Sequence, residues 1–336
     1  MQGARLSRLV FASMKLLVTG ASGFAGRNLL KLLQSQDPKP ALYGWHRGQI
    51  ETGQYPGINW SQVDLIDADA VERAIARTRP THLIHLAAAS NVGSSFRTPA
   101  LTWEINAIGT LNLMESLWRS SPETRVVMIS SAAVYGQAFA AGRAVDEDAV
   151  PLPLDPYGAS KLACEILAGV YLRRGLHVLI LRPFNYLGAG QIGNLVIPTF
   201  TQQLARIKCE QSPPRLLVGN LETTRDFLHI RDVVRAYWDV LRFCDDIPSG
   251  TVMNVSSGIP RKIADILADL IRLSALHQVE VNTDTARLRP SDIPVAIGDA
   301  SKLHRLTGWE PLMDWEETLE ECLTDARKRL ANQGAG

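Results

Sequence analysis

The chain has 336 residues, of which 46% are hydrophobic, so it can bury a large core and is not expected to be disordered. Its 35 basic and 34 acidic side chains leave a formal net charge of +1. No overall field therefore directs it to nucleic acid or to an anionic membrane, and an anionic ligand must be bound by local groups.

The N-terminal residues 1–13 contain only one short apolar run, Leu9–Ala12, which is too short for the core of a secretion signal. We expect these residues to be an extension, either disordered or the result of an upstream start. No segment approaches the roughly 18 apolar residues of a membrane span. The cysteines are far apart and form no CxxC pair, so we expect a cytoplasmic protein with four free thiols and no metal site: Cys164, Cys209, Cys244 and Cys322.

Strand-like apolar runs alternate with helical patterns through residues 14–183. This alternation predicts a doubly wound α/β domain, in which helices cover a parallel sheet. The predicted strands are Lys15–Thr19, Ala41–Trp45, Asn59–Val63, His82–Leu86, Arg125–Ser130 and His177–Leu181.

After about Phe184 the alternation gives way to loops that contain proline, glycine and asparagine. We expect residues 184–330 to form mainly a smaller lobe, interleaved with the sheet, and residues 331–336 to form a tail. The chain shows no internal repeat and no low-complexity stretch. Helices are predicted in this part at Arg231–Phe243, Lys262–Leu273 and Trp315–Leu330.

The first predicted strand leads into a glycine-rich turn and then into a helical pattern. Gly20 permits the tight turn, Gly23 lets a pyrophosphate approach the backbone, and Gly26 lets the helix pack on the strand. A phosphate would lie at the positive end of that helix. The glycine spacing is three and three instead of two and three, and a purely structural turn is the alternative. The position at the start of the sheet favours a dinucleotide site formed by Gly20, Ser22, Gly23, Phe24, Ala25 and Gly26.

The end of the second predicted strand indicates which dinucleotide is bound. An NAD site places an acidic residue there, where it binds both ribose hydroxyls. Here the sequence has no carboxylate between Pro38 and Ile50, whereas His46 and Arg47 could accommodate a 2′-phosphate. We therefore predict NADP(H) rather than NAD(H), with an ordinary solvated charge as the alternative for Arg47.

A further helix is predicted to begin at Asp155 and Pro156, which suit its N-cap and its first position. Tyr157 and Lys161 then lie on one helix face. A lysine beside a phenol lowers the pKa of the phenol, which makes it a usable acid or base. Such a pair also arises by accident, but the polar segment Ser130–Gly136 follows the fifth strand at the edge where sheets bind ligands.

Five segments together resemble the extended short-chain dehydrogenase/reductase superfamily, and the resemblance extends from about Met14 to Leu330. The segments are Thr19–Gly26, Leu86–Ala88, Asn106, Ser130–Gly136 and Tyr157–Lys161. The resemblance implies a Rossmann domain that binds NADP(H) at residues 14–183 and a lobe that binds substrate at residues 184–330.

The resemblance also implies roles for individual residues. Ser131 would hydrogen-bond the reacting oxygen, Tyr157 would exchange its proton, and Lys161 would tune Tyr157 while holding the nicotinamide ribose. Asn106 matches a helix asparagine of the superfamily, and a structural role is one alternative for this residue. The remaining matches place five residues in the cofactor site: Asp64 and Leu65 beside the adenine, and Leu86, Ala87 and Ala88.

Three later segments resemble the substrate-lobe motifs of superfamily members that modify GDP-mannose, above all the GDP-4-dehydro-6-deoxy-D-mannose reductases. They are Arg182–Gln191, Gly219–Phe227 and Arg289–Asp292. The resemblance implies that the diphosphate or sugar of a GDP-linked substrate is bound by Asn185, Arg225 and Arg289, with Asp292 as a nucleoside contact. A guanidinium that donates two hydrogen bonds is a natural partner of phosphate. For Arg225, the alternative is an ion pair with Asp226 or Asp232.

The residues after Ser131 indicate the reaction. Related 4,6-dehydratases carry a glutamate two positions beyond the catalytic hydroxyl, where this chain has Ala133, and Ala132 also lacks a carboxyl group. Eliminating water needs an acid and a base that alanines cannot provide, whereas reduction needs only a hydride and the Tyr157 proton. We therefore expect NADPH-dependent reduction of the C4 keto group of GDP-4-dehydro-6-deoxy-D-mannose to GDP-6-deoxy-D-mannose.

Other functions stay open. A 4-epimerase, or a ketoreductase for another nucleotide sugar, needs the same three catalytic residues, but epimerases of this superfamily usually retain NAD, which His46 and Arg47 fit less well. A catalytically silent NADP-binding sensor or scaffold would be expected to lose one of the three. The superfamily often dimerises through the helices that correspond to Ala100–Trp118 and Tyr157–Leu172, so we expect a homodimer.

Overall fold

The computed structural model describes residues 13–37, 39–48, 50, 55–193, 195–287 and 293–333. Apart from Ser13, the predicted N-terminal extension lies outside the described residues, and so do Arg289 and Asp292. In the described ranges, no helix has both the length and the apolar character that crossing a bilayer requires. All four cysteines are described, and all four are free thiols.

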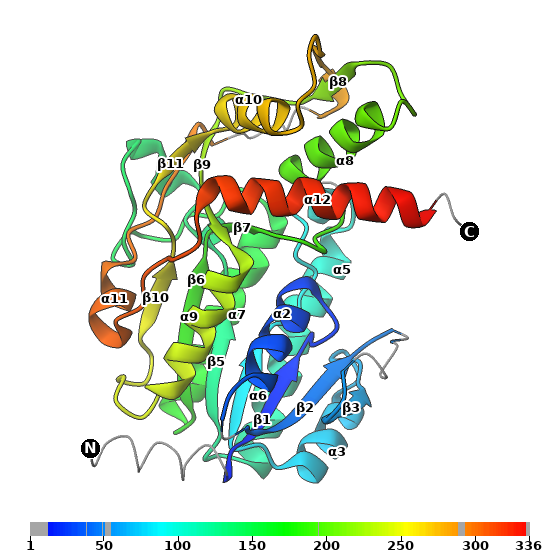
Figure 1. Cartoon of the computed structure of the whole chain (residues 1–336). Helices are drawn as coiled ribbons and strands as arrows, with labels where there is room; N and C mark the ends of the chain where they lie inside the picture. The colour runs from blue at the N-terminus through cyan, green and yellow to red at the C-terminus, as the bar shows by residue number, and fades with distance from the viewer. Residues whose placement is uncertain are drawn as a thin grey trace.

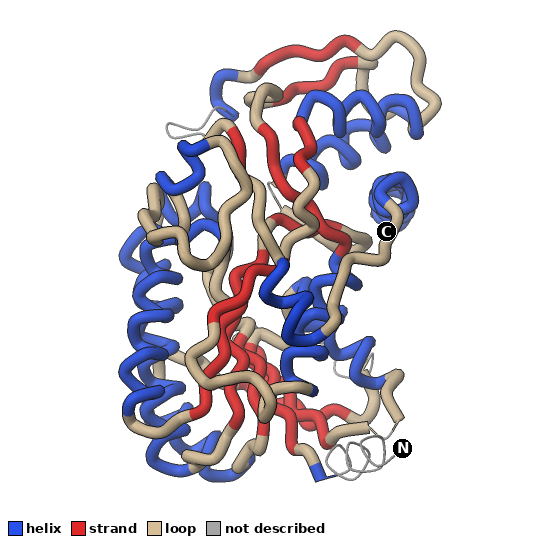
Figure 2. Tube along the Cα trace, turned by 90° about the vertical axis from the view of Figure 1, so that its left-hand side faces the viewer, coloured by secondary structure: helices blue, strands red, loops and turns tan. Residues whose placement is uncertain are grey.

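The central sheet, as far as the structure describes it, has seven parallel strands covered by helices on both faces (Figure 1, Figure 2). They are β1 (Lys15–Thr19), β2 (Ala41–His46), β3 (Ile58–Gln62), β4 (His82–His85), β5 (Arg125–Ile129), β6 (His177–Pro183) and β10 (Val252–Val255). Their order is β10-β6-β5-β4-β1-β2-β3. The order changes direction between β1 and β4, and ligands bind beyond the carboxyl ends of the strands at such a point.

Two hydrophobic cores lie on the two faces of this sheet. Alternate residues of a strand point to opposite faces, so Leu16 and Val18 belong to one core and Leu17 to the other. The first core is covered by α2 (Phe24–Gln34), α9 (Ile230–Arg242) and α11 (Ser301–Thr307). The second is covered by α3 (Ala68–Thr78), α6 (Gly109–Ser120) and α7 (Pro156–Arg173). Beside α7 lie α4 (Val92–Arg97), α5 (Pro99–Trp103) and the π-helical turn η2 (Glu104–Ile108).

The predicted α/β class is confirmed, and each of the six predicted strands forms with ends that differ by two residues or fewer from those expected. The seventh strand, β10, was not predicted, because four residues are too few to show a period. The chain thus returns to the sheet after residue 184 with both α9 and β10.

A smaller lobe lies beyond the carboxyl ends of the strands, and its core is separate from the two sheet cores. The lobe contains strands where the sequence indicated loops. They are β7 (Asn185–Leu187), β9 (Thr224–His229), β11 (Pro260–Lys262) and β13 (Val295–Ala296) in one small sheet, and β8 (Arg215–Val218) with β12 (Glu280–Thr283) in another.

Three helices complete the lobe: α8 (Val196–Lys208), α10 (Ile263–Leu273) and α12 (Trp315–Gln333). Figure 1 shows α12 crossing the molecule between this lobe and the central sheet. Residues 331–333, which were expected in the tail, belong to α12. Among the described residues, short 3-10 turns occur at η3 (Ala132–Val134), η4 (Gln137–Ala141) and η5 (Thr285–Arg287).

Candidate active site

The turn between β1 and α2 needs glycine at two positions. Gly20 has a φ of +66°, and a Cβ on it would lie 2.7 Å from the backbone nitrogen of Ala87. A Cβ on Gly26 would lie 2.6 Å from the carbonyl oxygen of Ala21. Because real Cβ atoms do not approach backbone atoms so closely, these glycines let β1, α2 and the end of β4 pack together.

The N-terminus of α2 fits a phosphate group. Its N-cap is Gly23, which has no side chain to cap the helix, and Ser22 before it is half-buried. The first N–H groups of a helix have no acceptor within the helix, so those of Phe24, Ala25 and Gly26 are available to an anion. This end of the helix therefore suits the pyrophosphate of a dinucleotide.

The ends of β1 and β4 are joined beside this turn. The Leu86 N–H donates to the Thr19 carbonyl oxygen (3.3 Å), and the Ala87 N–H donates to Thr19 Oγ1 (3.3 Å). Thr19 Oγ1 also lies 2.7 Å from Nδ1 of His85, whose pKa burial lowers to about 3, so the imidazole is neutral. Leu86, Ala87 and Ala88 therefore lie next to the glycine turn, on the side of β4.

The ends of β2 and β3 carry the residues predicted for the adenosine side. Arg47 is exposed at the end of β2, whereas His46 Nδ1 donates to the Gly48 carbonyl oxygen (2.5 Å). The His46 imidazole is thus engaged within the protein, and Arg47 is the better placed of the two for a 2′-phosphate. Beyond β3, Asp64 is exposed, while Leu65 is buried and its carbonyl oxygen accepts from Asn112 Nδ2 (2.9 Å).

The three predicted catalytic residues come from two segments in direct contact. Ser131 follows β5 and is the N-cap of η3, where its Oγ accepts from the Ala133 N–H (3.1 Å). Tyr157 and Lys161 lie one turn apart in α7. A Cβ on Gly158 would lie 2.6 Å from the Ala133 carbonyl oxygen, so η3 packs against the first turn of α7. This packing brings the Ser131 hydroxyl into hydrogen-bonding contact with Tyr157.

Burial decides the charge states of this pair. Desolvation raises the pKa of Tyr157, and the hydrogen bond with Ser131 only partly opposes that rise. The pKa of Tyr157 was expected to be lowered, and this is wrong, because burial sets the direction of the shift. The phenol therefore stays protonated, as a proton donor must be. Burial also lowers the pKa of Lys161, which is 3% exposed and forms no ion pair within the described ranges. A buried ammonium of this kind suits a ligand with oxygen acceptors.

Asn106 lies in the π-helical turn η2 and connects two parts of the site. Its Oδ1 accepts from the Ala89 N–H (2.7 Å), and its Nδ2 donates to Ser160 Oγ (2.8 Å). It therefore ties the loop after β4 to α7, which is a structural role.

Two of the predicted substrate residues lie on neighbouring strands of the small sheet. Asn185 pairs in register with Phe227, two residues beyond Arg225, and its Nδ2 donates to the Asp226 carbonyl oxygen (3.1 Å). Arg225 Nη1 donates to the Ile293 carbonyl oxygen (2.6 Å). Arg225 is thus bound to the segment that leads into β13, and it pairs in register with Ala296 of that strand. Arg289 and Asp292 lie outside the described residues.

The alternative partners of Arg225 are engaged elsewhere. Asp226 is fully buried, and its carboxylate accepts from the N–H groups of Ser257 and Gly258 (both 2.8 Å). Asp232 pairs with Arg235 (2.8 Å). Neither aspartate forms an ion pair with Arg225.

Sequence reasoning missed a buried ion pair near the predicted catalytic residues. Arg182, at the end of β6, donates to both carboxylate oxygens of Glu165 (2.9 and 2.7 Å), and the two side chains are 5% and 7% exposed. Ser130 Oγ donates to the same carboxylate (2.5 Å). The local sequence offers one indication that Glu165 belongs to this region, because Glu165 lies one helical turn after Lys161 in α7. Its pairing with Arg182 depends on how α7 packs against β6.

Comparisons with known proteins agree with this arrangement. The family model of GDP-mannose 4,6-dehydratase matches residues 17–322. The chain is 34% identical to a GDP-6-deoxy-D-mannose reductase from Pseudomonas aeruginosa, over 96% of this chain and 100% of that protein. It is 30% identical to a GDP-6-deoxy-D-talose 4-dehydrogenase from Aggregatibacter actinomycetemcomitans, over 88% of this chain and 92% of that protein.

A solved structure shares the whole fold. The Pseudomonas aeruginosa protein RMD, in a complex with NADPH, has a TM-score of 0.80 and 32% identity, with 94% of this chain and 100% of that chain covered. The matches extend over both the central sheet and the lobe, and they confirm the superfamily that the sequence motifs resemble. The chain therefore belongs to the GDP-mannose 4,6-dehydratase family of the extended short-chain dehydrogenase/reductase superfamily.

Proposed function

We propose that this protein is an NADPH-dependent 4-ketoreductase that converts GDP-4-dehydro-6-deoxy-D-mannose to GDP-6-deoxy-D-mannose. The observation that carries the proposal is the contact of Ser131 with a protonated, buried Tyr157. Ser131 is the N-cap of η3, and the next two residues of the chain are alanines. The site holds a proton donor for reduction, but Ala132 and Ala133 provide no acid or base for loss of water. The relative named as a GDP-6-deoxy-D-mannose reductase supports the choice of substrate.

The reaction divides between cofactor and protein. When bound, NADPH supplies the hydride that reduces the C4 carbonyl. Tyr157 donates its phenolic proton to the carbonyl oxygen, and the Ser131 hydroxyl hydrogen-bonds the same oxygen as negative charge develops there. Lys161 would hold the ribose of the cofactor, and its ammonium charge would stabilise the phenolate that remains on Tyr157.

The substrate diphosphate is held by the small sheet in this proposal. Arg225 and Arg289 would bind its oxygens, because a planar guanidinium matches phosphate geometry. Arg225 lies on β9, which neighbours both β7 and β13 in the small sheet. Asn185 on β7 and Asp292 would bind the sugar or nucleoside.

The reaction is tested by incubating the protein with NADPH and GDP-4-dehydro-6-deoxy-D-mannose and identifying the product by NMR. The expected result is GDP-6-deoxy-D-mannose with one NADPH consumed per product. A talose-configured product would assign the opposite C4 stereochemistry. Loss of water from GDP-mannose without net use of cofactor would contradict the reductase proposal.

The proposed preference for NADPH rests on Arg47. We expect NADPH to bind about tenfold or more tightly than NADH, because an arginine contact with the 2′-phosphate is a charge-assisted hydrogen bond. Arg47→Asp should erase or reverse the preference, since repulsion replaces attraction. The control is Arg73→Asp on the exposed side of α3, which changes the net charge equally. Equal Kd values for the two cofactors in the unaltered protein would refute the assignment.

We also propose a homodimer formed through α5 and α7. Large apolar side chains of this region are exposed: Phe96, Leu101, Trp103, Ile108, Ile166 and Val170. Packing against a second copy would remove them from water. Light scattering should give twice the 36.9 kDa chain mass. Ile166→Glu should give monomers and Leu312→Glu on another surface should not; a monomer in the unaltered protein would contradict the proposal.

A further inference from the structure

Tyr186, the first residue of the segment Tyr186–Gln191, contacts the first turn of α2 and lies near Tyr157. The Tyr186 ring stacks on Phe24, the first residue of α2, with ring centroids 6.2 Å apart and planes 13° apart. The Tyr186 phenol is also among the groups that raise the pKa of Tyr157. Tyr186 therefore belongs to the wall of the proposed dinucleotide site, although the motifs gave it no role.

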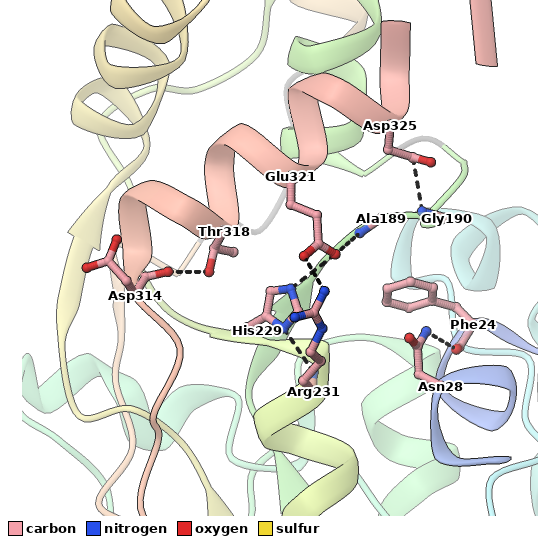
Figure 3. A network of polar contacts seen from close by, with 10 residues as sticks. All are labelled: Phe24, Asn28, Ala189, Gly190, His229, Arg231, Asp314, Thr318, Glu321 and Asp325. Carbon is pink, nitrogen blue, oxygen red and sulfur yellow. Dashed lines mark hydrogen bonds and ion pairs between the residues drawn. The ribbon is translucent and has the colours of Figure 1, made fainter. Parts of the chain in front are cut away.

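This segment is held by three side chains of α12, which we call the α12 clamp: Glu321, Asp325 and Arg329. Figure 3 shows Glu321 and Asp325 pointing from α12 toward the Ala189–Gly190 turn. The clamp makes a hydrogen bond to each of three consecutive residues: from Ala189 N–H to Glu321 Oε1 (3.3 Å), from Gly190 N–H to Asp325 Oδ2 (2.9 Å), and from Arg329 Nη1 to the Gln191 carbonyl oxygen (2.9 Å).

The clamp carboxylates are themselves fixed by charged neighbours. Arg231 Nη2 lies 2.7 Å from Glu321 Oε2, and Arg329 Nη2 lies 2.8 Å from Asp325 Oδ2. His229 Nδ1 accepts from the Arg231 N–H, so its neutral ring carries the proton on Nε2, which lies 3.4 Å from Glu321 Oε1. Glu321 is thus oriented from the junction of β9 and α9, and α12 is tied to the sheet side of the molecule.

Tyr186 and Leu187 are fixed in β7 by pairing with β9, whereas Gly188–Gln191 beyond the strand would have more conformational freedom without the clamp contacts. Gly190 has a φ of +84°, and a Cβ on Gly188 would lie 2.6 Å from Ile230 Cγ2, so the turn depends on two glycines. Glycine loses more conformational entropy than other residues when it is ordered. A segment that is already ordered does not incur this cost when a ligand binds against it.

We propose that the α12 clamp preorganises Gly188–Gln191, which together with Tyr186 at β7 forms a wall of the dinucleotide site, and that Tyr186 contacts the bound cofactor. Glu321, Asp325 and Arg329 are then positioning residues for cofactor affinity. This inference rests on the proposed function, because it takes NADPH as the ligand of the site.

The test is a fluorescence titration of the full-length protein with NADPH, which needs no sugar substrate. Glu321→Ala and Asp325→Ala should each raise the NADPH Kd about five- to tenfold, as expected for loss of one charge-assisted hydrogen bond. The loss in kcat at saturating NADPH should be smaller than the loss in affinity. Glu321→Gln and Asp325→Asn keep an oxygen acceptor and should recover most of the affinity. Glu320→Ala, an exposed neighbour on α12, is the matched control and should leave the Kd unchanged.

Tyr186 is tested separately. Tyr186→Phe keeps the ring that stacks on Phe24. The NADPH Kd of this variant should therefore be lower than that of Tyr186→Ala by a factor of about five or more. Equal Kd values for these two variants would remove Tyr186 from the site.

Thermal melting of each variant separates positioning from folding. If the alanine variants of the clamp melt normally and bind NADPH as tightly as the unaltered protein, the clamp proposal is wrong. The clamp proposal is also wrong if Glu321→Gln and Asp325→Asn lose as much NADPH affinity as the alanine variants. An equal loss of affinity in the control Glu320→Ala would contradict it too. If the unaltered protein does not bind NADPH at all, the proposed function itself fails, and this inference fails with it.

Discussion

Replacement of Tyr157 by phenylalanine is expected to lower turnover of the 4-keto substrate by a factor of about 10² or more, because only the proton donor is lost. The ring remains, so the packing of α7 against η3 is kept, and the NADPH Kd should change little. Steady-state kinetics at saturating substrate and a separate NADPH titration measure the two effects. The structure strengthens this expectation, since burial keeps the phenol in the protonated form that reduction requires.

Two further variants make the result specific. Lys161→Ala should damage both turnover and cofactor binding, because Lys161 acts on the phenol and on the ribose. Tyr171→Phe provides a control on the same helix, since the Tyr171 hydroxyl bonds Glu115 (2.7 Å) and takes no part in the proposed reaction. Near-normal turnover in Tyr157→Phe would show that the catalytic assignment is wrong.

Replacement of Glu165 by alanine is expected to lower the free energy of unfolding by about 3–5 kcal/mol, the usual effect of breaking a buried ion pair. Arg182 is 5% exposed and bonds both oxygens of this carboxylate, so its charge would stay buried without a partner. Ser130 would lose its acceptor as well. Urea denaturation followed by circular dichroism gives the change directly.

A surface pair in the same protein provides the comparison. Arg119 and Glu115 form an ion pair on α6 with side chains 57% and 27% exposed, so Arg119→Ala should cost about 0.5 kcal/mol or less. Replacing both Glu165 and Arg182 with apolar residues should recover part of the loss, because no unpaired charge is then buried. A cost below about 1 kcal/mol for Glu165→Ala would contradict this account of the pair.

Features that depend on short stretches of chain could be predicted from the sequence. The strand, glycine turn and helix at Lys15–Gln34 form as expected, because the left-handed turn at Gly20 and the close approach of Gly26 to the Ala21 carbonyl oxygen are local features. The start of α7 is another example. The Asp155 side chain accepts from the Gly158 N–H (2.8 Å), as its predicted N-cap position requires, and this cap sets Tyr157 and Lys161 on one helix face.

Features that depend on packing between distant segments were decided only by the tertiary structure. No local pattern indicates that β10 joins the sheet beside β6, that Glu165 pairs with Arg182, or that α12 holds Ala189 and Gly190. Even the direction of the Tyr157 pKa shift was mistaken, because helix spacing brings Lys161 near but does not reveal how completely the phenol is buried. The local sequence determines which groups can interact along one helix or strand. Desolvation of a group and its pairing with a distant residue arise only when separate helices and strands pack together.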